Sequence, residues 1–270
     1  MQITHVIRGE DHLSNTLRQV MLYDALELAK PVFAHVSLIL GDDRSKLKKR
    51  EGQEGTYVDE YRDRGYLPDA LVNFLALLGW SSASGAEVLS RDQLRAEFDL
   101  GRVAASPAIF DATKLRWMAG EHLRAAGVQD LAQRALPFLA AAGLAADAGR
   151  AAAWVRAFRD SIACLSELPA KVQQLLDPGP IEPEAAAALA TGGARRLMAY
   201  LDEQLGARAD LDGAGFKALL QTAGKELGIK GKDLFMPARA ALTGRTHGPE
   251  LPLLFDALGP ALAHERVRNA

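Results

Sequence analysis

The sequence changes character near Gly120, and this change limits the folds that are open to the chain. Residues 3–40 follow a strand–helix–strand pattern, whereas the sequence after Gly120 is rich in alanine and has helical spacing. No stretch of that second part resembles a strand. We therefore predict a mostly α fold with a small α/β segment near residue 1 and a helical body behind it.

The strand–helix–strand segment has clear boundaries. β-Branched residues from Ile3 to Arg8 predict the first strand, residues 9–12 break it, and Pro31 ends the helix that follows. A second strand is expected over residues 33–40. We expect the buried stripe of the helix to consist of Leu17, Val20, Met21 and Leu28. One such β-α-β unit is a partial Rossmann half, and a Rossmann fold binds its nucleotide between two halves.

Composition sets limits on the kinds of site. With 270 residues there is room for two or three domains, and a net charge of −2 confines any nucleic-acid-binding surface to a local patch. Aromatic residues make up 6%, which weighs against a base-stacking platform. Cys164 is the one cysteine, so we expect no disulfide, no zinc and no other protein-bound metal. Neither a membrane span nor a signal peptide is predicted, and we expect a cytoplasmic protein without membrane contact.

A basic loop follows the second expected strand. Five of the ten residues from Gly41 to Arg50 carry a positive charge, and the loop begins with a turn signal. Lysine supplies a compact charge and arginine a planar fork, so such a loop suits a polyphosphate. The alternative is a solvated surface turn, which is what most runs of like charge turn out to be.

Charged residues also mark the end of the first expected strand. Arg8, Glu10, Asp11 and His12 stand where ligands bind in open α/β sheets. An arginine there can hold a carboxylate, and an acidic residue can accept hydrogen bonds from ribose hydroxyls. The alternative is a strand-to-helix turn whose acidic residues favour the helix terminus. The tetrapeptide alone favours the two interpretations about equally.

Several motifs in order resemble one family, the bacterial glutamyl-tRNA synthetases, which are class I ligases. The resemblance runs from residue 3 to about residue 255. Its motifs are the segment 3–16, the tripeptide 33–35, the KMSKS-like run 46–50, and the segments 61–68, 77–81, 110–117, 234–237 and 241–250.

The resemblance implies an activity. Family members ligate glutamate to tRNA(Glu) with ATP and Mg²⁺, through a glutamyl-adenylate. It implies that Lys46, Lys49 and Arg50 are catalytic, because they would neutralise charge while pyrophosphate leaves. Lys49 would also bind ATP.

The resemblance assigns the remaining substrate contacts near the expected strands. Arg8 would bind glutamate, and Asp11 would face either the ATP ribose or the amino acid. Leu38 and Ile39 would lie along the adenine, with an ordinary buried strand as the alternative for these two residues.

The resemblance also divides the chain into regions. Residues 1–45 would be the C-terminal part of the catalytic domain, 46–125 the loop and a stem-contact region, and 126–270 an α-helical anticodon-binding body. Arg195, Arg196 and Arg239 are candidates for tRNA contact. A solvated basic helix face is the alternative for any single lysine of the basic stretch between residues 217 and 245.

Two departures from the family limit the expected activity. Lys48 and Glu51 replace the serine and histidine common in the family loop. No HIGH-type signature occurs in this sequence, although family members carry one in a preceding first half. We therefore expect the chain to be incomplete for catalysis and to need that half, which a separate chain could carry. The alternatives are a non-catalytic tRNA-binding module and a purely structural partner.

Overall fold

The computed structural model describes residues 2–41, 44–45 and 57–270. It divides the chain into two compact units, residues 1–122 and 123–270. Lys46, Lys49 and Arg50, which the sequence analysis assigns to catalysis, lie outside the described residues. Most described residues are helical and the sheets are small and parallel, so the predicted mostly α fold class is confirmed.

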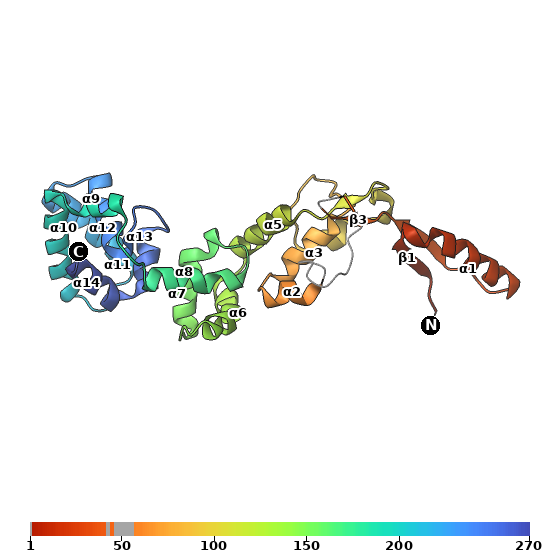
Figure 1. Cartoon of the computed structure of the whole chain (residues 1–270), viewed down its shortest axis with the longest axis horizontal. Helices are drawn as coiled ribbons and strands as arrows, with labels where there is room; N and C mark the ends of the chain where they lie inside the picture. The colour runs from red at the N-terminus through yellow and green to blue at the C-terminus, as the bar shows by residue number, and fades with distance from the viewer. Residues whose placement is uncertain (1, 42–43, 46–56) are drawn as a thin grey trace. The chain divides into compact units, whose positions relative to one another are not determined.

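The first unit begins with the predicted β-α-β segment (Figure 1). Its strands β1 (His5–Gly9) and β2 (Val32–Val36) pair in parallel, with Arg8 opposite His35. A 3₁₀ turn, η1 (Glu10–His12), leads from β1 into helix α1 (Leu13–Ala25). The second predicted strand is two strands, because β3 (Ile39–Leu40) leaves β2 and pairs with β4 (Ala108–Ile109) instead.

The predicted buried stripe of this helix is wrong. Leu17 is 67% exposed, Met21 is 70% exposed and Leu28 is also exposed, while Val20 is half-buried. Thr16 is the buried residue of α1. Apolar spacing predicts the helix correctly, but the stripe has no apolar surface to pack on among the described residues of its own unit.

The rest of the first unit is helical and has its own core. Its elements are α2 (Val58–Asp63), α3 (Pro68–Ala76), α4 (Arg91–Glu97), η2 (Leu100–Arg102) and the greater part of α5 (Ala112–Ala125). Trp80, Leu89 and Leu94 form a buried cluster between α3 and α4. Ser90 and Gln93 close a capping box that starts α4.

The second unit consists of helices (Figure 1). Its elements are α6 (Val128–Ala141), α7 (Ala148–Phe158), η3 (Arg159–Ser161), η4 (Leu165–Glu167), α8 (Leu168–Leu176), α9 (Pro183–Leu189), α10 (Gly192–Gly206), α11 (Gly213–Leu227), α12 (Lys232–Thr243), α13 (Leu251–Leu258) and α14 (Pro260–Arg268). The rings of Phe216 and Phe255 stack in its core, with centroids 4.4 Å apart. No helix in the described ranges is both long and apolar enough to cross a membrane.

Long-range hydrogen bonds join the helix ends of the second unit. Trp154 is buried and its indole Nε1 donates to the carbonyl of Ala257, 2.9 Å away. Arg266 donates to the carbonyls of Leu175 and Leu176 at the end of α8 and to Leu242 near the end of α12. One guanidinium therefore satisfies carbonyl groups that two helix ends leave without intrahelical partners.

Candidate functional site at the end of the first strand

The side chain of Arg8 is held at the carboxyl end of β1 by contacts with two elements, α1 and β2. Its Nη2 donates to Thr16 Oγ1 at 2.5 Å and to Gln19 Oε1 at 2.8 Å, both on α1. Its guanidinium carbon lies 5.7 Å from the ring centroid of Phe33 on β2, within the range of a cation–π contact. Its Nε is buried and has no hydrogen-bond partner among the described residues.

Gly9 brings Asp11 and Leu38 to one point. A Cβ atom added at Gly9 would lie 2.5 Å from Asp11 Oδ1 and 3.8 Å from Leu38 Cδ2. The Asp11 carboxylate therefore occupies the space that a side chain at residue 9 would need. Asp11 and Leu38 therefore lie close together beside Gly9, the residue that follows Arg8 in the chain.

Neither predicted adenine contact is buried. Leu38 is half-buried and Ile39, in β3, is exposed. These two residues therefore do not form an ordinary buried strand, which was the alternative interpretation. The sequence analysis assigned no role to Thr16, Gln19 or His35, although Thr16 and His35 lie within its motifs. A polar residue within a stripe of apolar helical spacing was the available signal for Thr16.

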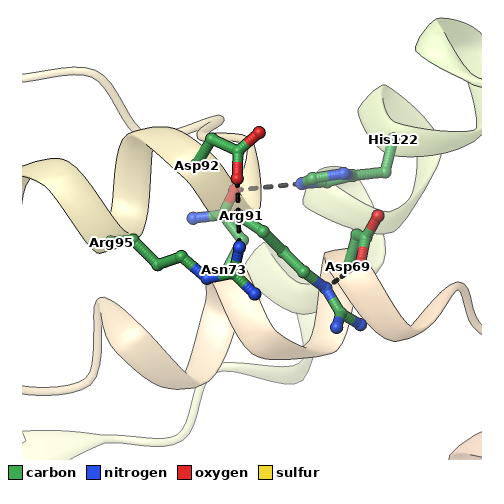
Figure 2. Close-up of polar contacts among 6 residues, drawn as sticks. All are labelled: Asp69, Asn73, Arg91, Asp92, Arg95 and His122. Carbon is green, nitrogen blue, oxygen red and sulfur yellow. Dashed lines mark hydrogen bonds and ion pairs between the residues drawn. The ribbon is translucent and has the colours of Figure 1, made fainter.

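A second polar cluster lies deeper in the first unit (Figure 2). Asn73 on α3 is fully buried, and its Oδ1 accepts hydrogen bonds from the Leu89 backbone N–H at 2.8 Å and from His122 Nε2 at 3.0 Å. Because Oδ1 can only accept, His122 Nε2 carries a proton. Burial lowers the pKa of His122, and the opposing effect of Asp69 on that pKa is smaller. This hydrogen bond ties α5 to α3, and the lowered pKa favours the neutral form of His122.

Exposed ion pairs surround this cluster (Figure 2). Arg91 pairs with Asp69, and Arg95 pairs with Asp92 at 3.2 Å. All four side chains are largely exposed, so these pairs contribute little to stability. The cluster is a structural anchor in the first unit. Its one visible signal in the sequence is an asparagine, Asn73, on an otherwise apolar helix face.

The predicted tRNA contacts lie on two helices of the second unit. Arg195 and Arg196 are exposed on α10. Arg239, on α12, is half-buried and donates to the carbonyl of Pro249, and burial lowers its pKa. It therefore orders the turn after α12 while part of its surface stays accessible.

Two cavities flank that turn. One, of about 210 Å³, is lined by Phe158 and Leu254 and by the cationic or titratable side chains of Lys171, Arg245 and His247. The other, also about 210 Å³, is lined by Lys217, Phe235 and Arg239 among others. Both combine apolar walls with cationic side chains, although Glu250 also lines the second cavity. Apolar walls beside cations suit a nucleobase and its phosphate.

Comparison with known proteins identifies the family. A family described as tRNA synthetases class I (E and Q), catalytic domain, matches residues 1–117, and an anticodon binding domain matches residues 130–270. The chain belongs to the class I tRNA synthetases of this E and Q group. The resemblance stated from the motifs is confirmed.

Individual relatives agree with this assignment. The chain is 44% identical to a glutamate–tRNA ligase of Carboxydothermus hydrogenoformans over 100% of its own length and 57% of that protein. It is 45% identical to that of Heliobacterium modesticaldum, over 56% of that protein. A crystal structure of a glutamate tRNA ligase from Elizabethkingia meningosepticum in complex with its amino acid matches with a TM-score of 0.80 and 27% identity, over 57% of that chain. The chain thus spans little more than half the length of these relatives.

Proposed function

We propose that this chain supplies part of a cytoplasmic glutamate–tRNA ligase, which activates glutamate with ATP as glutamyl-adenylate and transfers it to tRNA(Glu). The observation that carries the proposal is the geometry at the carboxyl end of β1, where α1 and β2 hold Arg8 and where Asp11 and Leu38 meet beside the next residue, Gly9. A cation, a carboxylate and an apolar surface at one strand end match the chemistry of glutamate, ribose and adenine.

In the proposed reaction, Arg8 holds a carboxylate of glutamate by charge-assisted hydrogen bonds. Asp11 accepts hydrogen bonds from the ATP ribose or from the ammonium group of the amino acid. A glutamate oxygen attacks the α-phosphate and pyrophosphate leaves, so negative charge shifts onto the leaving group. Lys46, Lys49 and Arg50 would neutralise that charge, with Lys49 also on ATP.

ATP enters this reaction as its magnesium complex. The described residues contain no group of three or more histidine, cysteine or acidic side chains placed to hold a metal. Mg²⁺ commonly binds through substrate phosphates and one or two carboxylates, so it needs no such protein cage. Magnesium would therefore arrive with ATP as part of the substrate.

The apolar surface of the β1–α1–β2 segment supports the proposal that the site is incomplete in this chain. Large apolar side chains of this segment are exposed, and they are Ile3, Ile7, Leu13, Leu17, Met21, Leu22, Leu26, Leu28 and Val32. Among the described residues, β1 pairs with β2 alone. An exposed apolar surface of this size marks an interface. We propose that it is covered by the first half that relatives carry, either in the same polypeptide or on a separate chain.

The second unit would contact tRNA. Arg195, Arg196 and Arg239 remain the proposed contacts, and the two cavities beside the turn after α12 would receive unstacked bases. Arg239 would contribute in part by ordering that turn.

Two assays test the function. The chain is mixed or fused with the first half of the Carboxydothermus hydrogenoformans ligase, and glutamate-dependent pyrophosphate exchange is measured with and without that half. Exchange is expected only in the assembled protein. Exchange by the chain alone would contradict its incompleteness, whereas no exchange in either sample would reject the ligase proposal.

The second assay measures binding of tRNA(Glu) by the chain alone at increasing salt. Affinity is expected to fall as salt rises, because phosphate contacts release counterions. Salt-dependent binding without exchange in the assembled protein would favour a non-catalytic tRNA-binding module. Loss of both activities would favour a purely structural partner.

A further inference from the structure

Thr16 lies at the centre of a polar contact between three elements. Its Oγ1 is 2.5 Å from Arg8 Nη2, 2.7 Å from His35 Nε2 and 3.1 Å from the carbonyl oxygen of His12. Arg8 and His35 are opposite residues of the parallel pair β1–β2, so their side chains share a face of the sheet. Helix α1 therefore meets that face through a hydroxyl group rather than through its leucines.

The hydroxyl can satisfy all three neighbours in one arrangement. Arg8 can only donate, so Thr16 Oγ1 accepts from it. The single O–H of Thr16 donates its hydrogen bond to the His12 carbonyl. The contact with His35 then requires that His35 Nε2 donates to Thr16 Oγ1. The hydroxyl then accepts from both Arg8 and His35, and its position is fixed from three directions.

Gln19 completes the arrangement around Arg8. Its Oε1 accepts from the same Nη2 at 2.8 Å. Arg8 therefore donates to Thr16 and to Gln19 through one nitrogen of its guanidinium. The Phe33 ring lies over the guanidinium carbon. The buried Nε has no partner among the described residues, and an unsatisfied buried donor in a native fold calls for an explanation such as ligand binding.

We propose that Thr16, together with Gln19 and His35, is a positioning residue for glutamate binding by Arg8. The arrangement fixes Nη2 of the guanidinium and leaves the N–H groups of Nη1 to the carboxylate. An arginine side chain has many rotamers, so fixing it beforehand lowers the entropic cost of binding. This inference rests on the proposed function of Arg8 as the glutamate contact.

One experiment tests the positioning in the chain alone. Side-chain ¹H–¹⁵N NMR spectra are recorded for the chain and for Thr16→Val, which keeps the shape and removes the hydroxyl. Arg8→Lys assigns the Arg8 signals. Separate Nη2 proton signals are expected in the chain and in Thr16→Ser, and merged signals in Thr16→Val. Unchanged Arg8 signals in Thr16→Val would overturn the inference.

Two further variants control for folding. Thr222→Val removes an exposed threonine hydroxyl that also donates to the carbonyl four residues earlier, Ala218. It should leave the Arg8 signals unchanged. Gln19→Met removes the other acceptor from an exposed position, so it preserves the fold even if Thr16→Val does not. Gln19→Met is expected to loosen Arg8, and the inference fails if it does not.

The second experiment uses the protein assembled with a first half. Thr16→Val is expected to raise KM for glutamate about tenfold, with kcat and KM for ATP nearly unchanged, as for a lost hydrogen bond to a charged group. Thr16→Ser should restore KM. Equal KM values for Thr16→Val and Thr16→Ser would overturn the positioning role. An unsubstituted assembly without exchange would instead reject the proposed function, and the NMR result would still decide the geometry.

Discussion

The β1–α1–β2 segment and the second unit use apolar residues in opposite ways. In α1 one residue of thirteen is buried, and it is a threonine. In α13 five residues of eight are buried, and all five are apolar. Both helices have apolar residues at helical spacing, so the pattern alone does not say what a helix packs on. The second unit supplies the surface for α13 itself, whereas α1 meets its sheet through a polar cluster and presents its leucines outward.

The same substitution in both regions tests this contrast most strongly. Leu201→Ala, at a fully buried position of α10, should lower the free energy of unfolding by about 3 kcal/mol because it leaves a cavity. Leu17→Ala in α1 should change it by less than about 0.5 kcal/mol in the chain alone. Urea unfolding followed by circular dichroism measures both. An equal decrease in the free energy of unfolding in both variants would contradict the contrast between the two regions.

The charged part of the first region gives the next largest effect. Arg8→Ala should lower kcat/KM for glutamate about 100-fold in the assembled protein, since it removes the proposed charge-assisted contact with that substrate. The affinity of the same variant for tRNA should stay unchanged, because the proposed tRNA contacts lie in the second unit. Pyrophosphate exchange and filter binding provide the two measurements. A loss of tRNA affinity matching the loss of exchange would contradict this separation.

A smaller effect is expected from Gly9→Ala. The new methyl group would occupy the position of the Asp11 carboxylate, so Asp11 must turn away. KM for ATP or for glutamate should rise about fivefold, roughly the effect of one weakened hydrogen bond. Stability should hardly change, because the displaced atom ends a flexible side chain. Steady-state kinetics with each substrate varied in turn would show which ligand Asp11 contacts. Unchanged KM values for both would exclude Asp11 from the site.

The smallest effect concerns pH and the anchor at Asn73. Burial lowers the pKa of His122 below its ordinary value of 6.5, so the unfolded chain takes up the proton first as pH falls. The contribution of His122 to the free energy of unfolding is therefore constant above pH 6.5 and becomes unfavourable below it. His122→Gln keeps an N–H donor but does not titrate.

Fluorescence can report this effect for the first unit. In a common Trp154→Phe background the remaining tryptophans, Trp80 and Trp117, both lie in the first unit. Urea unfolding is then compared at pH 7.5 and pH 5.5. The free energy of unfolding should fall less between pH 7.5 and pH 5.5 in His122→Gln than in its parent. An equal decrease in both proteins would exclude His122 as the cause.

Local signals allowed much of the first region to be predicted. The strand of β1, the turn at residues 9–12, helix α1 and β2 all follow from β-branched residues, a glycine and a proline. Arg8 and Asp11 could be selected because a strand end with these side chains is a known place for ligands. The contacts of Thr16, Gln19 and His35 could not be predicted, because they depend on how α1 crosses the sheet.

The sequence by itself determined the mostly α fold class, the single β-α-β unit and the family, since these depend on local propensity and on the order of motifs. The tertiary structure alone decided which apolar stripe is buried, that the second strand divides between two sheets, and that Asn73 joins Leu89 to His122. Burial and pairing are properties of two surfaces in contact. A stretch of sequence specifies only one of them.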